Sequence, residues 1–268
     1  MTRLFLTLAF AAAAVVSSAQ SQYAAKVTVN SGNSFVVKQL KIQGDRLYAE
    51  TGQSSTALSM ISAIEFRFSG ISLSMCESMF EKGDRKSLEN LLEQSVGPVA
   101  GYSYLPTNLG DYLMWMLRAR YWNGNAAGFG TTFGQIRQSK ETARVEEGSL
   151  YFALTLLDQG KVDNAKTVLA SVENPDIYSV PMAEYIRGRI ALEEGDPRRA
   201  MRHVARVLAF HSRDAEWLPP ATVLEARVYQ RLGQPEKAAA VAEELMIAYP
   251  DSRWSREGEK IKMESTGN

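Results

Sequence analysis

Reactive side chains are scarce in this sequence. Its 268 residues include one cysteine and two histidines. A single cysteine cannot form a disulfide within the chain, so packing alone must hold the fold together. Neither charge sign dominates, because 30 Lys and Arg residues balance 30 Asp and Glu residues. This balance gives no support for binding to a polyanion, and we expect no nucleic-acid partner.

Known catalytic and cofactor motifs are also missing from the sequence. His203 and His211 fall on one predicted helix, roughly 12 Å apart at about 1.5 Å per residue, so they cannot share a metal ion. No HExxH, GxSxG, P-loop or GxGxxG motif occurs. We therefore expect no catalytic residue, no cofactor and no metal site, and we interpret the chain as a protein that is not an enzyme.

The N-terminus carries the one long apolar run. Residues 1–19 combine a basic Arg3, an apolar stretch over 4–16 and small residues at 17–19, which is the pattern of a cleaved secretory signal peptide. The run is too short to span a bilayer, although an uncleaved N-terminal anchor is the alternative. We predict an exported protein, periplasmic in a Gram-negative bacterium or secreted, with no transmembrane segment in the mature chain.

Residues 20–69 differ in character from the rest of the chain. Short alternating or β-branched segments are separated there by turn material such as Asn30-Ser-Gly-Asn33, which predicts a small antiparallel β module. Its closing segment, Ile61-Ser-Ala-Ile-Glu-Phe66, resembles the last strand of small SH3-like or Sm-like barrels in exported bacterial repeat proteins. The resemblance implies a barrel-like module. The alternative is a structural cap over the first helical hairpin.

A short sequence motif that begins with glycine recurs through the remainder of the chain. The positions that match its final residue are 88, 129, 165, 200 and 238, so the steps are 41, 36, 35 and 38 residues. Repeats of this length, with a glycine turn between two apolar-periodic segments, indicate stacked helical hairpins. We predict five hairpins between residues 72 and 250, then a capping helix, within a solenoid that covers 70–268. The clearest copies are Gly160-Lys-Val-Asp-Asn-Ala165, Gly195-Asp-Pro-Arg-Arg-Ala200 and Gly233-Gln-Pro-Glu-Lys-Ala238.

The fifth hairpin resembles a tetratricopeptide repeat (TPR). The small, aromatic, turn, second small and terminating positions of that repeat are occupied by Ala226, Tyr229, Gly233, Ala238 and Pro250. The resemblance implies a mainly α fold, a TPR-like α-solenoid of about five helical hairpins preceded by the small antiparallel β module. The first two hairpins depart from the pattern, because larger residues replace the second small one.

Three other features have two interpretations each. Cys76 falls at the small position of the first hairpin, which favours a buried packing residue over a reactive thiol. The step of 41 residues contains the stretch 96–109, which is either a functional loop or a poorly packed joint. Arg198, Arg202 and Arg206 recur every four residues on one helix, and either bind an anionic surface or face solvent paired to nearby acids.

The TPR resemblance implies a binding surface on the concave face, which the first helix of each hairpin lines in that family. Arg and aromatic residues there suit interface hot spots, whereas the alternative is buried aromatics beside solvated arginines. Carrying the positions over gives these candidate partner-binding residues: Arg118, Tyr121, Trp122, Leu150, Leu154, Tyr185, Arg189, Arg227 and Arg231.

The resemblance further implies a function without catalysis. We expect an exported scaffold or adaptor that binds a protein or peptide of the cell envelope through the concave groove. The alternative is a binder of anionic lipid or glycan at the envelope surface, through the three arginines on one helix and the β module. The identity of the partner and the oligomeric state stay open at this point.

Overall fold

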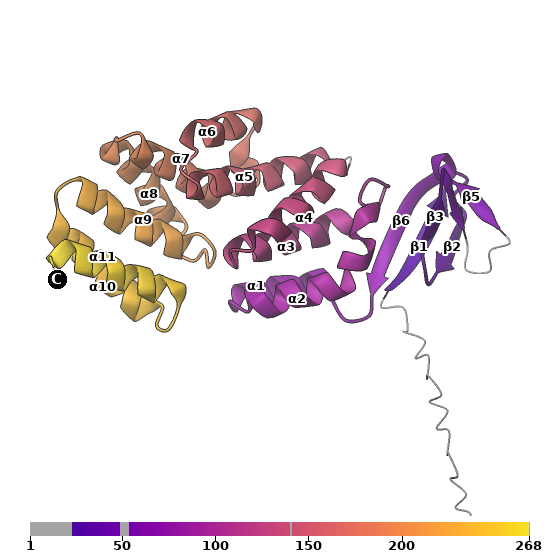
Figure 1. Cartoon of the computed structure of the whole chain (residues 1–268), viewed down its shortest axis with the longest axis horizontal. Coiled ribbons are helices and arrows are strands. Elements are labelled where there is room, and N and C mark those ends of the chain that lie inside the picture. Colours follow the sequence, from indigo (N-terminus) through magenta and orange to yellow (C-terminus); the bar gives the residue numbers. More distant parts are fainter. Residues whose placement is uncertain (1–22, 49–53, 140, 268) are drawn as a thin grey trace, which may run out of the picture.

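The computed structural model of this chain describes residues 23–48, 54–139 and 141–267, so the predicted signal peptide at 1–19 lies outside the described residues. Two small β-sheets come first, and the helices that follow curve into an arch (Figure 1). This architecture confirms the predicted fold class, a mainly helical chain preceded by a small antiparallel β part.

The β part consists of two antiparallel sheets of three strands each. Along β1 and β6, alternate side chains pair in a buried core, with Ala25 opposite Phe66 and Val27 opposite Ile64. The first sheet has the order β2-β1-β6, and the second has the order β3-β4-β5. The strands are β1 (Tyr23–Val29), β2 (Ser34–Val37), β3 (Lys41–Gln43), β4 (Arg46–Tyr48), β5 (Ser55–Ala57) and β6 (Ile61–Phe68).

The described strands do not close into a barrel, so the resemblance to SH3-like or Sm-like barrels is not confirmed. Strands β3, β4 and β5 have three residues each and pair only with one another. Strands this short cannot supply the continuous, staggered hydrogen bonding that closes a barrel. The sequence signal for short antiparallel strands was sound, but it carried no information on how the two sheets join.

In the described part of the chain, the α-helices form five antiparallel hairpins and one further helix. The hairpins are α1–α2, α3–α4, α5–α6, α7–α8 and α9–α10, and α11 packs on α10 and α9. The helices are α1 (Leu73–Glu81), α2 (Arg85–Ser95), α3 (Leu109–Trp122), α4 (Ala126–Gln138), α5 (Thr142–Asp158), α6 (Val162–Ser171), α7 (Val180–Glu193), α8 (Pro197–Phe210), α9 (Leu218–Arg231), α10 (Pro235–Ala248) and α11 (Arg253–Thr266). Three short 3₁₀ helices are η1 (Leu58–Met60), η2 (Gly97–Tyr102) and η3 (Pro175–Ile177).

The same turn joins the two helices in every hairpin. Its glycine has φ between 70° and 78° in all five copies, the left-handed region that L side chains rarely adopt. In the fourth hairpin Gly195 donates its N–H to the carbonyl of Leu192 at 3.0 Å, and Asp196 donates to Ala191 at 2.9 Å. This pair of bonds satisfies the last carbonyls of the first helix. The weaker copies of the glycine motif, at Gly83 and Gly124, therefore form turns of the same kind.

Small residues stand where the paired helices approach most closely. Ala165, Ala200 and Ala238 are fully buried, and Leu88 and Phe129 occupy the matching positions of the first two hairpins. Cys76 is also fully buried, and burial raises the pKa of its thiol to about 12. This confirms the interpretation of Cys76 as a packing residue, since a neutral thiol is a poor nucleophile.

The stretch 96–109 is the joint between the β part and the helices. The N–H of Ile64 donates to the carbonyl of Pro106 at 2.8 Å, which covers part of the free edge of β6. Asn108 bonds both backbone groups of Phe66, at 2.8 and 3.0 Å. Tyr102 adds a bond from its hydroxyl to the carbonyl of Leu40 at 3.2 Å. The stretch is therefore a well-anchored joint, so the interpretation as a poorly packed joint was wrong. A functional role for the loop stays untested.

Candidate partner-binding site

The first helices of the hairpins share the inner side of the arch, where α3 packs on α5, α5 on α7, α7 on α9 and α9 on α11. The structure places all nine candidate residues on these helices. They fall into three groups that differ in burial and in contacts. The groups are Arg118, Tyr121 and Trp122 on α3, Leu150 and Leu154 on α5, and Tyr185, Arg189, Arg227 and Arg231 on α7 and α9.

The three candidate residues on α3 are contacted by another segment of the same chain. Glu216, in the connection 211–217 between α8 and α9, reaches across the inner side of the arch and is only 7 % exposed. Its carboxylate accepts bonds from the Arg118 guanidinium at 2.5 Å, from the Trp122 indole N–H at 2.7 Å and from the Tyr151 hydroxyl at 2.8 Å. We call residues 211–217 the inner segment.

An aromatic cluster surrounds the inner segment. The ring of Trp217 lies 5.4 Å from Trp122, 5.9 Å from Tyr151 and 5.7 Å from Tyr185, measured between ring centroids. Asp214 fixes the local backbone, because its carboxylate accepts the N–H groups of residues 216 and 217 at 3.0 and 2.8 Å. The segment is therefore part of the packed structure and covers Trp122 at the end of α3, although a cavity lined by Trp115, Arg118 and Glu216 stays open beside it.

The electrostatics at this contact favour the ion pair. Burial by itself would lower the pKa of Arg118, but interactions with Tyr151 and Glu216 outweigh it and the pKa is raised. Burial also raises the pKa of the Tyr151 hydroxyl well above its usual range. Arg118 thus stays charged and Tyr151 stays a neutral donor, which are the states that hold a carboxylate.

The aliphatic candidates are part of the core. Leu150 and Leu154 have no exposed surface, and Trp122 is nearly buried. Tyr121 lies in the same aromatic cluster, with its ring 4.9 Å from Trp122 and 5.8 Å from Tyr151. In this conformation these side chains support the inner side of the arch from beneath, and a partner cannot contact Leu150 or Leu154.

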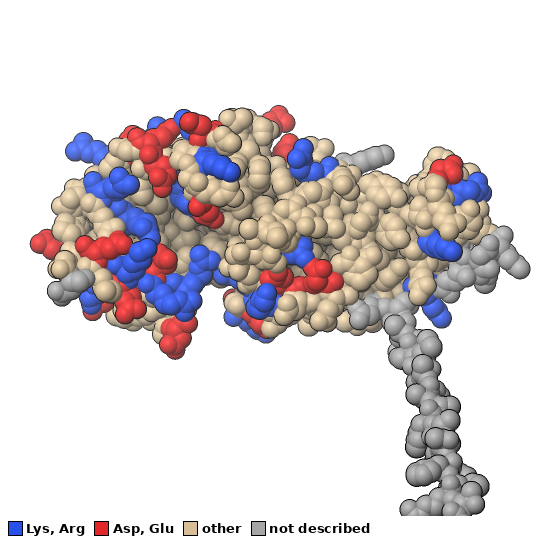
Figure 2. Space-filling view, viewed as in Figure 1, with Lys and Arg blue, Asp and Glu red and all other residues tan. Residues whose placement is uncertain are grey.

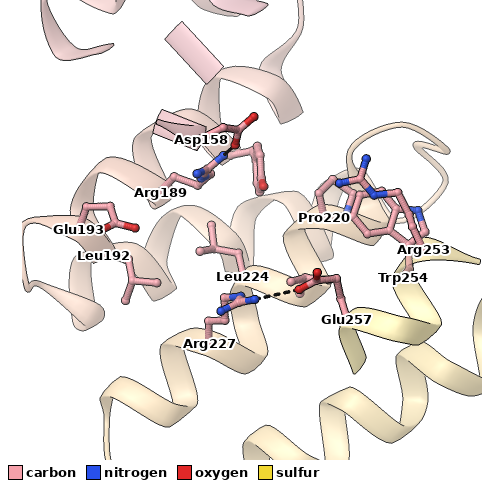
Figure 3. A pocket seen from close by; sticks show the side chains of 12 residues that line it. Asp158, Arg189, Leu192, Glu193, Pro220, Leu224, Arg227, Arg253, Trp254 and Glu257 are labelled. Carbon is pink, nitrogen blue, oxygen red and sulfur yellow. Dashed lines mark hydrogen bonds and ion pairs between the residues drawn. The ribbon is translucent and has the colours of Figure 1, made fainter. Parts of the chain in front are cut away.

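Tyr185, Arg189 and Arg227 come together around an open cavity of about 300 Å³, which we call the inner-face pocket (Figure 3). It lies among the end of α5 and the helices α7, α9 and α11. Arg231, at the exposed end of α9, is not among its lining residues. The lining consists of Asp158, Tyr185, Arg189, Leu192, Glu193, Pro220, Val223, Leu224, Arg227, Arg253, Trp254 and Glu257.

Two of the three arginines in the inner-face pocket are already paired. Arg189 bonds Asp158 at 2.6 Å, and Arg227 bonds Glu257 at 2.8 Å. Burial would lower the pKa of Arg189, but Tyr185 and Asp158 outweigh it and raise the pKa. Both arginines are held in fixed orientations, so they shape the walls of the pocket.

Arg253 is the third arginine and has no ion pair with any described residue. Its guanidinium lies 4.6 Å from the ring of Trp254 and 5.4 Å from that of Trp122, and donates to the Trp122 carbonyl at 3.2 Å. Stacking on two indoles holds the cation in place and leaves its other N–H groups free. Arg253 is therefore the group best placed to receive an acceptor from outside.

Glu193 and the apolar side chains complete the chemistry of the inner-face pocket. Figure 3 shows Glu193 and Leu192 on the side opposite Arg253, with Leu224 between the two sides. No described cation pairs with Glu193. Charged side chains of both signs gather over α9 and α11, where the surface is hollowed (Figure 2). A cavity with separated charges of both signs and an apolar wall fits a polypeptide segment.

Sequence reasoning missed Glu216, Trp217, Arg253 and Trp254. The inner segment falls within the 38-residue step, so the spacing marked the place but not the contacts. Arg253 and Trp254 begin α11, which was predicted only as a cap.

Within 23–48, 54–139 and 141–267, no three His, Cys, Asp or Glu side chains are placed to hold a metal ion. No helix in those ranges has the length and hydropathy needed to cross a membrane.

Comparisons with known proteins support the repeat assignment. Residues 223–252 match the sequence profile of a family described as tetratricopeptide repeat. This range covers most of α9, the glycine turn and α10, the hairpin with the clearest repeat pattern. No curated protein and no solved structure matches the chain. The match covers the fifth hairpin, and the other four hairpins have the same glycine turn, which supports tetratricopeptide-like repeats in this chain. Such repeats are modules that generally bind other proteins and do not catalyse reactions.

Proposed function

We propose that this protein is an exported, non-catalytic scaffold that binds a protein or peptide partner of the cell envelope through the inner-face pocket. The observation that carries the proposal is Arg253, an exposed cation stacked on Trp122 and Trp254 at the pocket mouth without a carboxylate partner among the described residues. The export of the chain rests on the pattern of residues 1–19 alone.

The pocket suits a protein ligand better than a small molecule. Its walls come from four helices, and its unpaired charges, Glu193 and Arg253, lie on opposite sides with Leu224 between them. A peptide that places an acceptor on Arg253 and an apolar side chain on Leu192 or Leu224 satisfies both surfaces. Repeat arrays present extended inner surfaces of this kind to their partners.

The test is photo-crosslinking in intact cells from positions at the pocket. A photoreactive residue replaces Glu193 or Arg227, and Glu244 on the second helix α10 serves as the control position. We expect one discrete protein adduct from the two pocket positions and none from Glu244, with loss of the adduct when Arg253→Ala is added. Equal labelling from all three positions, or no adduct from either pocket position, would contradict the proposal.

The localisation is tested separately by fractionation of the same cells. We expect the mature chain in the periplasmic or secreted fraction, shortened by about the length of a cleaved signal peptide. A full-length chain that stays in the cytoplasm would overturn the export part of the proposal and leave the pocket part standing.

A further inference from the structure

Helix α8 (Pro197–Phe210) has an unusual charge distribution for a chain with no net charge. Its 14 residues include four arginines and one histidine, and no aspartate or glutamate. The opposite side of the helix is apolar, and Ala200, Val204 and Val207 on that side are fully buried against the neighbouring helices. All the cationic side chains are consequently displaced from the buried side.

The exposed side of α8 presents a row of three arginines. Arg198 and Arg202 are exposed and form no ion pair with any described residue. Arg206 contacts Glu184 at 3.3 Å, yet 60 % of its side chain remains accessible. The nearest acids are engaged elsewhere, since Glu184 also bonds His203 and Glu194 bonds Lys166. The row therefore keeps most of its positive charge available.

The row ends in an exposed aromatic ring. Phe210 follows Arg206 by the same four-residue step and is 80 % exposed, without a ring contact to any described aromatic residue. From Arg198 to Phe210 the row is roughly 18 Å long at about 1.5 Å per residue. An apolar ring beside several arginines is costly in water and favourable where charged headgroups adjoin acyl chains.

The matching helices of the neighbouring hairpins lack this pattern. Helix α10 carries Glu236, Glu243 and Glu244 against one lysine, and α6 carries one acid and one lysine. The basic face is thus a local feature of the fourth hairpin and does not follow from the repeat architecture. It also lies on a second helix, whereas the inner-face pocket is formed by α5, α7, α9 and α11.

We propose that the exposed side of α8 docks this protein onto an anionic phospholipid bilayer, with Arg198, Arg202 and Arg206 among the phosphates and Phe210 inserted at the headgroup boundary. Mobile phosphates adapt to flexible arginines spaced along one helix, and no fixed concave site is needed. Phe210 supplies an apolar contact that a complementary acidic protein surface would not require. The function goes beyond the partner binding proposed for the inner-face pocket.

The expected affinity is modest and depends on salt. Each arginine close to an anionic membrane increases partitioning by about fivefold, so three arginines give on the order of 100-fold. Insertion of one phenylalanine adds about tenfold. Binding should weaken steeply as the ionic strength increases, because the attraction acts over a Debye length of about 8 Å at physiological salt.

The experiment is co-sedimentation of the purified protein with phosphatidylcholine vesicles, with and without phosphatidylglycerol. The test variant is Arg198→Gln/Arg202→Gln/Arg206→Gln. A matched control, Arg137→Gln/Arg256→Gln/Lys260→Gln, removes three exposed positive charges from α4 and α11. We expect binding only to the anionic vesicles, a loss of about 100-fold in the test variant and little loss in the control. Phe210→Ser should lower binding about tenfold and leave its salt dependence unchanged.

Circular dichroism of each variant shows whether the fold is retained. Replacement of the three α8 arginines by lysine should preserve most of the vesicle binding, because headgroup attraction depends on charge more than on guanidinium geometry. Equal binding to neutral vesicles, equal loss in both triple glutamine variants, or no binding of the wild-type protein would overturn the proposal. None of these outcomes bears on crosslinking from the inner-face pocket.

Discussion

The most informative single substitution is Glu216→Gln in the inner segment. It keeps the size of the side chain and removes the charge that three donors share. Arg118, with 22 % of its side chain exposed, then loses its only ion-pair partner among the described residues. Its Nε also has no hydrogen-bond partner there. The substitution thus leaves a mostly buried cation without a direct ion pair to any described residue, and only the more distant charge of Glu147 and the rings of Phe80 and Trp115 still favour it. The amide N–H groups of the new side chain also face the three donors that the carboxylate accepted from.

The magnitude follows from the burial of the pair. Loss of one member of a buried ion pair costs about 3–5 kcal/mol, and the partial exposure of Arg118 favours the lower end, about 3 kcal/mol. The control is Glu257→Gln, which breaks the Arg227 pair where both side chains are more than a third exposed. Such a pair contributes about 0–1 kcal/mol.

Urea denaturation followed by circular dichroism compares the two variants. We expect a clear decrease in the free energy of unfolding for Glu216→Gln and little change for Glu257→Gln. A loss below about 1 kcal/mol for Glu216→Gln would show that Arg118 reaches water easily, and the reasoning about a closed inner contact would fail. An equal loss in both variants would show that burial does not distinguish the two pairs.

Three further predictions concern the turns, the thiol and the joint. Gly195→Ala should lower the free energy of unfolding by about 1–2 kcal/mol in the same assay, because a Cβ at φ 78° meets no neighbour and only the backbone conformation is strained. Cys76 should react with a thiol reagent only after denaturation, and its burial should make stability decrease as pH increases from 9.0 to about 12, since the unfolded thiol ionises first. Asn108→Ala should lower the free energy of unfolding by about 1–3 kcal/mol and speed amide exchange in β6, because two bonds to Phe66 are lost.

Local signals made the hairpins predictable. The glycine turn depends on a few consecutive residues, so even the weak copies at Gly83 and Gly124 could be recognised in the sequence. The paired helices likewise need small or apolar residues at fixed offsets, as at Cys76 and Ala153. Each of these features depends on residues within one repeat. There, residues that are close in the sequence are also close in space.

The site was harder to predict, because its contacts join distant repeats. Arg118 and Glu216 are 98 positions apart, and their contact depends on how far each hairpin rotates relative to the last. The same rotation decides that Leu150 and Leu154 are covered whereas Tyr185, Arg189 and Arg227 face a cavity. Small differences in the rotation between successive hairpins accumulate along the stack. The sequence pattern of a single repeat does not predict the total rotation between distant hairpins.

The β part shows a different limit. The alternating pattern predicted short antiparallel strands, and these are present. It did not predict that β6 would be covered by the joint through Pro106 and Asn108 instead of closing onto another strand. Edge coverage involves residues some 40 positions downstream of β6, beyond the reach of a local pattern.

The contacts of Glu216 and Arg253 with α3 also change the mechanics expected of this stack. In an open array of repeats, each repeat contacts only its neighbours in sequence. A terminal repeat can therefore unfold or be deleted without affecting distant repeats. Here the Arg253–Trp122 bond joins residues 131 positions apart. This bond ties the last helix of the array to the second hairpin. Removal of α11 should therefore destabilise the second hairpin as well as the fifth. Unfolding should then become more cooperative, and refolding slower, than in an open stack of equal length.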